Sequence, residues 1–266
     1  MKEIVVLNEC KSQFELPESP LFWNGDCYWV DIKLGLIFRS DLQLNNLNVI
    51  GLLEDVSSLI VYNSEVYAVN KTGLFRLTNN YLAKDQNVIF EISEQFRTNE
   101  CSLSEKGVLC ISFMHKTDSS KKGGVIAIQI EDGREIHRIT NIGIPNTLLW
   151  LNAENFILVD SNSSKYFYVD TKKNWEIREI DVNLNGIVGG LSGVPDGSTR
   201  MPNGNILNAR YGGGLLIELN LAFDLVDVYK VPWVNVTSIS HIYKSTYLLT
   251  YARSHAEPGG VAVICL

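Results

Sequence analysis

The chain has 266 residues, of which 45% are hydrophobic and 20% are charged, and its formal net charge is -7. This length suffices for one large domain or two. The acidic balance excludes sequence-independent binding to nucleic acid, which needs a basic face. No apolar run approaches the roughly 18 residues of a membrane span, and no secretory signal is recognisable. We therefore expect a cytoplasmic protein that acts on small molecules or cations, without a nucleic-acid or membrane partner.

The first residues, 1–8, include the short apolar run Ile4-Val5-Val6-Leu7, which is typical of a β-strand. After this strand, a unit of two consecutive strands recurs along the chain. Its six copies begin near Cys27, Glu65, Val108, Phe156, Ile206 and Tyr247. The copies are about 44 residues apart on average, which is the period of four-stranded propeller blades.

The apolar residues form short runs and alternations of period two, which are typical of strands and not of long helices. We predict an all-β fold: a six-bladed β-propeller of four-stranded antiparallel blades. A single domain over residues 1–266 is expected, because a blade without its neighbours cannot bury both faces of its sheet. An N-terminal strand commonly completes the last blade of a propeller, so Ile4 to Leu7 should pair in the sheet that contains Val261 to Cys265.

Several kinds of active site are disfavoured by the sequence. The five cysteines follow no CxxC spacing, so we expect reduced thiols that are mostly buried in strands. The four histidines are scattered and form no H-E-x-x-H motif, which disfavours a histidine-based zinc site. There is no G-x-S-x-G motif, so a serine hydrolase has no support either.

Polar residues stand at one equivalent place in the repeats, 9 or 10 residues before the second strand of a copy. They are Glu18, Asn99, Asn146 and Asp196, and the remaining two copies hold Ser57 or Ser58 and Thr237 or Ser238. The first strand of every propeller blade lines the central axis, so residues at its start converge on one mouth of the channel.

Two carboxylates and two amides at one mouth would offer oxygen ligands only, which suits a hard divalent cation such as Ca²⁺, Mg²⁺ or Mn²⁺. The alternative is that these are simply turn residues. Pro-Glu-Ser-Pro, Pro-Asn and Pro-Asp-Gly are all good turn formers. Residue chemistry and spacing leave both readings open.

Four short motifs, in order along the chain, resemble the senescence-marker-protein/gluconolactonase/regucalcin-like family. Leu16-Pro17-Glu18-Ser19-Pro20-Leu21-Phe22-Trp23 with Tyr28-Trp29-Val30-Asp31-Ile32 resembles its G-E-G-P-x-W…L-Y-W-V-D-I opening. Arg97-Thr98-Asn99-Glu100 resembles its R-x-N-D segment, and Ile144-Pro145-Asn146 its P-N-G segment. Val194-Pro195-Asp196-Gly197 with Gly212-Gly213-Gly214 resembles its x-P-D-G…G-G-G segment.

The resemblance implies a six-bladed propeller that hydrolyses a sugar lactone or a similar small cyclic ester. It implies one divalent metal ion held by Glu18, Asn146 and Asp196, with Ca²⁺ the first candidate and Mg²⁺, Mn²⁺ or Zn²⁺ also open. It further implies that Arg97 and Asn99 contact the substrate and that Asp196 doubles as the general base.

This chain departs from the family pattern at several of these positions. Ser19 and Thr147 replace glycines, and Glu100 replaces an aspartate. Some family members place a substrate-binding glutamate in the loop that corresponds to residues 115–122, where this chain offers only Asp118. Whether Glu100 or Asp118 takes that role stays open, and the native lactone cannot be carried over.

Two other functions remain as alternatives. One is a non-catalytic calcium-binding or scaffold propeller, and the other is a metal-dependent esterase or phosphotriesterase of the same architecture. In a purely structural reading, Arg97 would form an ion pair with Glu94 or Glu100. Tyr211, beside three glycines, belongs either to the core of a blade or to the wall of a pocket.

Overall fold

The computed structural model describes residues 1–78, 82–84, 90–183 and 190–266. Within these ranges the regular elements are β-strands, and no helix is present. The strands belong to two compact units, which are described in turn. The first unit comprises Met1–Val49 and Asp181–Leu266, and the second comprises Ile50–Ile180.

Three sheets belong to the first unit. One contains β3 (Pro17–Trp23), β4 (Asp26–Asp31), β5 (Leu36–Asp41) and β6 (Asn48–Leu52), whose last residues already belong to the second unit. Another contains β19 (Val194–Arg200), β20 (Ile206–Tyr211), β21 (Leu215–Leu219) and β22 (Leu225–Lys230), to which β1 (Lys2–Glu3) adds a short parallel strand. The third contains β23 (Val236–Tyr243), β24 (Thr246–Tyr251), β25 (Gly259–Cys265) and β2 (Val5–Phe14).

The second unit holds the other three sheets. The first of them contains β7 (Ser58–Tyr62), β8 (Glu65–Asn70), β9 (Gly73–Leu77) and β10 (Leu82–Lys84). The next contains β11 (Phe96–Leu103), β12 (Val108–His115), β13 (Gly123–Gln129) and β14 (Arg134–Ile142). The last contains β15 (Pro145–Trp150), β16 (Asn155–Asp160), β17 (Lys165–Asp170) and β18 (Glu176–Ile180).

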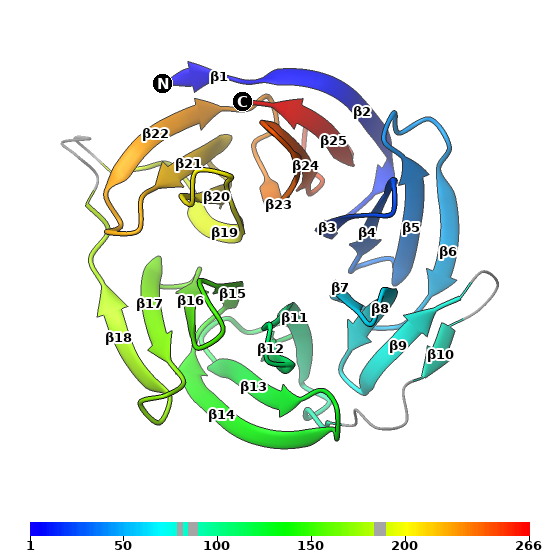
Figure 1. Ribbon diagram of the computed structural model, residues 1–266. Coiled ribbons are helices and arrows are strands. Elements are labelled where there is room, and N and C mark those ends of the chain that lie inside the picture. The colour runs from blue at the N-terminus through cyan, green and yellow to red at the C-terminus, as the bar shows by residue number, and fades with distance from the viewer. Residues whose placement is uncertain (79–81, 85–89, 184–189) are drawn as a thin grey trace. The chain divides into compact units, whose positions relative to one another are not determined.

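The predicted fold class, a six-bladed β-propeller of four-stranded antiparallel blades, is confirmed (Figure 1). The second strands β4, β8, β12, β16, β20 and β24 each begin within one residue of the predicted start. These strands are buried on both faces. In β16, for example, the four consecutive residues Phe156 to Val159 are all buried. A strand covered on both faces has no solvent side, which is why it is a continuous apolar run in the sequence.

The N-terminal strand completes the last blade, as predicted. β2 pairs antiparallel with β25, with Val5 opposite Cys265 and Val6 opposite Ile264, and Figure 1 shows it outside β25. The carboxylate of Glu9 in β2 accepts hydrogen bonds of 2.7 Å from Trp233 Nε1 and from the Tyr251 hydroxyl. These bonds reach past β25, so β2 is anchored to the interior of its unit as well as to its neighbouring strand.

The cysteines also follow the expectation. All five are free thiols; Cys27, Cys101 and Cys110 are buried, and the other two are partly exposed. Burial raises the pKa of the Cys27 thiol to about 12, so this side chain behaves as a small apolar group. In the described ranges, no helix has the length and apolar character needed to span a membrane.

Candidate functional site

The first strands of five blades are interrupted at the same place by a β-bulge of one residue. The interruptions lie between Glu18 and Leu21, Thr98 and Cys101, Asn146 and Leu148, Pro195 and Ser198, and Val236 and Ser238. All four polar residues predicted from the repeat therefore lie at or directly beside a bulge. Bulges are common next to active sites, because they change the direction of a side chain and leave backbone groups unpaired.

The first unit brings Glu18 and Asp196 together around one side chain. Their strands, β3 and β19, both contact β23, which lies between them (Figure 1). Asp196 is buried, whereas the phenol of Tyr211 is about one-third exposed. Burial of the phenol and the negative charges of Asp196 and Glu18 raise the pKa of Tyr211. The Tyr211 hydroxyl thus stays protonated near neutral pH and keeps its hydrogen for donation within electrostatic reach of the two carboxylates.

The start of β19 is held by a close contact between two glycine turns. A Cβ atom on Gly193 would lie 2.4 Å from the Tyr211 carbonyl oxygen, and one on Gly213 would lie 2.4 Å from the Ser192 carbonyl oxygen. Only glycine fits at either position. The buried Arg210 adds a hydrogen bond of 2.6 Å from Nη2 to the Gly193 carbonyl. The residues just before Asp196 are thus packed closely against the turn that follows Tyr211.

A buried amide supports the Asp196 bulge from the neighbouring strand. Asn208 in β20 has no exposed surface, and its Nδ2 donates to the Asp196 carbonyl and to Ser198 Oγ, each at 2.8 Å. The bulge interrupts the regular pairing between Pro195 and Ser198, and within it the Asn208 amide binds the Asp196 carbonyl. Asn208 therefore determines where Asp196 lies, although no sequence motif singled it out.

Similar supports occur in two more blades. Ser112 Oγ in β12 accepts a hydrogen bond from the Glu100 backbone N–H at 2.8 Å and donates one to the Pro145 carbonyl at 2.9 Å. Thr250 Oγ1 in β24 accepts one from Thr237 Oγ1 at 2.8 Å. Like Asn208, both have no exposed surface and lie between apolar residues of a second strand. A polar residue flanked by apolar ones in the middle of a second strand is the signal that would have revealed them.

In the second unit, the predicted residues Arg97, Asn99 and Asn146 form one chain of hydrogen bonds. Arg97 Nη1 donates to Asn99 Oδ1 at 2.7 Å, and Asn99 Nδ2 donates to Asn146 Oδ1 at 2.6 Å. Asn146 Nδ2 in turn donates to Ser161 Oγ at 2.9 Å. Asn99 Nδ2 also donates to the Pro145 carbonyl at 3.2 Å, so both hydrogens of its amide are used within the protein. Asn99 can therefore meet a ligand only as an acceptor, through Oδ1.

The two carboxylates named in the structural reading of Arg97 each have a further partner. Glu94 pairs with Lys71 at 2.6 Å, and Glu100 Oε1 accepts from the Cys101 backbone N–H at 2.9 Å. The Arg97 guanidinium donates hydrogen bonds to Asn99 Oδ1 at 2.7 Å and to the Thr98 carbonyl at 2.9 Å. Asp118, the other candidate for the substrate-binding carboxylate, lies in the turn after β12. It accepts hydrogen bonds from the backbone and side chain of Ser120, and these bonds lower the pKa of its carboxyl.

The two departures from the family's glycines coincide with left-handed backbone. Ser19 directly follows Glu18 and has φ = 50°, and Thr147 directly follows Asn146 and has φ = 28°. Glycine adopts positive φ at little cost, whereas a β-branched residue such as threonine does so under strain. The chain therefore stores backbone strain beside two predicted site residues, a feature that clusters at functional sites.

Glu100, next to Asn99, has a carboxyl group with a raised pKa. Burial raises the pKa of its carboxyl from 4.5 to about 7, although the bond from the Cys101 N–H opposes the shift. Between pH 4.5 and 7 the folded state then holds more protons than the unfolded state, so the free energy of unfolding falls as the pH rises through this window. We expect Glu100→Gln to be about 1 to 2 kcal/mol more stable than the wild type at pH 8, with little difference at pH 4.5.

Urea unfolding of both proteins in EDTA at several pH values measures this difference. Glu105→Gln, an exposed glutamate in the turn after β11, serves as the matched control and should follow the wild-type profile. Parallel profiles for Glu100→Gln and the wild type would show that Glu100 titrates normally.

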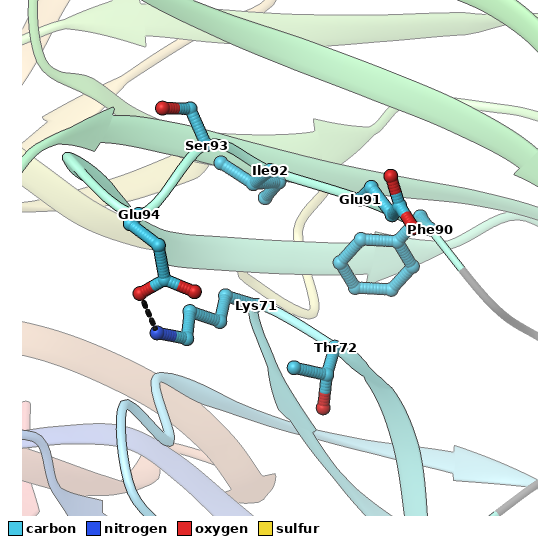
Figure 2. Close-up of a pocket in the computed structure, with 7 residues that line it drawn as sticks. All are labelled: Lys71, Thr72, Phe90, Glu91, Ile92, Ser93 and Glu94. Carbon is cyan, nitrogen blue, oxygen red and sulfur yellow. Dashed lines mark hydrogen bonds and ion pairs between the residues drawn. The ribbon is translucent and has the colours of Figure 1, made fainter.

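A cavity of about 580 Å³ lies elsewhere in the second unit (Figure 2). It is bounded by the turn after β8, with Lys71 and Thr72, and by the segment Phe90–Glu94 that leads into β11. The ion pair between Lys71 and Glu94 crosses its edge, and Lys71 also reaches Asp55 at 3.3 Å. The described residues that line it include none of the five predicted site residues.

The predicted ligand set of Glu18, Asn146 and Asp196 differs in kind from a cluster of acidic, histidine or cysteine side chains. Nowhere in the described ranges do three or more His, Cys, Asp or Glu side chains gather as metal ligands. The predicted set has only two carboxylates, Glu18 and Asp196, and its third member is the amide of Asn146. Two carboxylates and an amide oxygen suit a hard cation. Asn146 Oδ1 accepts one hydrogen bond from Asn99 Nδ2 and has a second lone pair for a ligand.

Comparison with known proteins gives a family and a fold. The model of the SMP-30/Gluconolactonase/LRE-like region matches residues 16–248. An uncharacterised protein of Sulfolobus acidocaldarius is 25% identical over 262 residues, which cover 93% of this chain and 90% of that protein.

Two solved structures share the fold at low sequence identity. A calcium-binding protein, regucalcin, from Agrobacterium tumefaciens has a TM-score of 0.81 at 19% identity, with 99% of this chain and 95% of that chain covered. A gluconolactonase from Xanthomonas campestris has a TM-score of 0.76 at 10% identity, with 99% and 89% covered. At these identities the similarity establishes the propeller fold but not the activity or the ligands.

Proposed function

Because this chain belongs to the SMP-30/gluconolactonase/LRE-like family, we propose that it is a divalent-metal-dependent hydrolase that opens a sugar lactone or a similar small cyclic ester. The observation that supports this most directly is the hydrogen-bond chain from Arg97 through Asn99 to Asn146. It joins the two proposed substrate-binding residues to a proposed metal ligand. A purely structural propeller has no need of such a chain.

We assign the metal to the side-chain oxygens of Glu18, Asn146 and Asp196, with Ca²⁺ as the first candidate and Mg²⁺, Mn²⁺ or Zn²⁺ as alternatives. The assignment rests on their equivalent positions at the bulges of three first strands and on the motifs of the family. A divalent ion so held supplies a Lewis acid that polarises a carbonyl oxygen.

The protein's own groups account for the other parts of the reaction. Asp196 acts as the general base that accepts a proton from the attacking water. Arg97 binds a hydroxyl or carboxylate of the substrate through its fork of donors. Asn99 accepts a hydrogen bond from a ring hydroxyl, since its own hydrogens are already used. Tyr211, beside both carboxylates, forms part of the wall against which the substrate rests.

The experiment that tests this function is a set of initial rates against a panel of lactones. The panel is run with Ca²⁺, Mn²⁺, Mg²⁺ or Zn²⁺ and with chelator. Metal-dependent turnover of at least one lactone is the expected result. The panel includes an aryl ester and a phosphotriester, and preference for either of these would replace the lactonase with the esterase alternative.

A second candidate function is calcium binding without turnover, because regucalcin, one structure with the same fold, is described as a calcium-binding protein. Ca²⁺ binding without hydrolysis of any member of the panel would favour this candidate.

The metal assignment predicts a change in thermal stability. A ligand that binds only the folded state raises its melting temperature by mass action. We expect Ca²⁺ or Mn²⁺ to raise the Tm of the wild type, and the rise to shrink markedly in Glu18→Gln, which loses a negative charge but keeps its size. Differential scanning fluorimetry across a metal titration measures both increments. An unchanged increment in Glu18→Gln would remove Glu18 from the site.

A further inference from the structure

Ser161 is a buried residue at the turn after β16, outside all the motifs discussed above. Its Oγ accepts the hydrogen bond of 2.9 Å from Asn146 Nδ2. We infer that Ser161 and Asn99 are positioning residues that together hold the Asn146 amide in one orientation, with its oxygen available as a metal ligand. This inference rests on the metal site of the proposed function.

The orientation of the amides follows from the groups at the ends of the chain of hydrogen bonds. Arg97 is only a donor, so Asn99 must present Oδ1 to it. The Pro145 carbonyl is only an acceptor, so Asn99 must present Nδ2 on its other side. Two independent groups therefore fix the Asn99 amide in the same sense.

The orientation of Asn99 then dictates that of Asn146. Asn99 Nδ2 is a donor, so Asn146 must accept this hydrogen bond with Oδ1. The Nδ2 of Asn146 then points to Ser161 and donates to its Oγ. A reversed Asn146 amide would place two NH₂ groups against each other at a separation that is now 2.6 Å. The reversed amide would also present nitrogen, which bears two hydrogens and cannot ligate a cation.

Ser161 and Asn99 have different tasks in this arrangement. A hydroxyl both donates and accepts, so Ser161 would tolerate either orientation of the amide, and the choice between them comes from Asn99. Ser161 supplies the second point of attachment. The terminal torsion of asparagine is soft, and with only one partner the amide would rotate about it. Fixing both ends is the usual way in which outer groups tune a metal ligand.

The first test compares two serine-to-alanine variants that lie two positions apart in the chain. Ser161→Ala removes the partner of Asn146. Ser163→Ala is the matched control, because Ser163 Oγ donates a bond of 2.9 Å to Asp160 and makes none to Asn146. We expect Ser161→Ala to bind Ca²⁺ and Mn²⁺ about 10- to 100-fold more weakly than the wild type by isothermal titration calorimetry, and Ser163→Ala to bind them normally.

The second test uses Asn99→Asp, which turns the donor toward Asn146 into an acceptor. If charge alone mattered, a new carboxylate near the site would tighten cation binding. Positioning predicts the opposite, because the Asn146 amide would reverse to donate to the new residue, and affinity would fall. Tighter binding by Asn99→Asp, measured in the same calorimeter, would overturn the role of Asn99.

The outcomes separate this inference from the proposed function. Wild-type protein that binds neither Ca²⁺ nor Mn²⁺ would refute the metal site and the inference together. Wild-type binding with an unchanged affinity in a folded Ser161→Ala variant would overturn the inference alone. Equal weakening in Ser161→Ala and Ser163→Ala would also overturn it, since the effect would then belong to the whole turn. Circular dichroism at the titration temperature confirms that each variant is folded.

Discussion

Asp196→Asn is expected to lower kcat on the best lactone by about 10²- to 10⁴-fold at saturating metal. The amide keeps an oxygen where the carboxylate had one but cannot accept a proton from water. Asparagine matches aspartate in size, and the bonds of Asn208 go to the backbone carbonyl of residue 196 and to Ser198, so the bulge should survive the change. Added metal should therefore restore occupancy without restoring turnover, as judged from steady-state rates over a metal titration.

Arg97→Ala provides the contrasting variant. If the guanidinium holds the substrate equally in the ground and transition states, its loss raises KM and leaves kcat nearly unchanged. The Pro145 carbonyl still fixes the Asn99 amide in this variant, so the metal affinity should also persist. Wild-type kcat in a metal-saturated Asp196→Asn would disprove the proposed base and favour either a different base or a binding protein without turnover.

The fold could be predicted from the sequence because the blade repeat imposes a strong pattern. Second strands such as β16 are apolar on both faces, and hairpin turns separate them from the third strands at a regular spacing. The closure by β2 could be anticipated as well, since a propeller leaves one strand of its last blade to the N-terminus. The same repeat located Glu18, Asn99, Asn146 and Asp196 at equivalent places.

The supports of these residues could not be predicted in this way. Asn208 and Ser112 bind backbone groups inside a bulge, and Ser161 binds the side-chain amide of Asn146 beside one. The bulge itself depends on strand register. A repeat aligned by its apolar runs carries no information about a register shift of one residue. The positive φ angles at Ser19 and Thr147 explain why glycine suits these two positions, whereas the sequence showed only that this chain departs from it.

Asn208→Leu should reveal how strongly the site depends on such a support. Leucine nearly matches asparagine in volume, but it cannot donate to the Asp196 carbonyl or to Ser198 Oγ. Both hydrogen bonds of the Asn208 amide would be lost, and taking a hydrogen-bond donor away from a polar group inside the protein costs about 1 to 3 kcal/mol each. We expect a loss of about 2 to 4 kcal/mol in the free energy of unfolding, measured by urea denaturation in EDTA.

The position of Asp196 should change together with this stability. Thr250→Val is the matched control, because it removes the equivalent buried support in β24 and leaves the bonds of Asn208 intact. Both variants should unfold more easily than the wild type, but only Asn208→Leu should lose metal-dependent stabilisation and turnover under conditions where it is fully folded. If Asn208→Leu is destabilised and yet binds metal and turns over as well as Thr250→Val, then the bulge holds Asp196 in place without the amide, and the support contributes to folding alone.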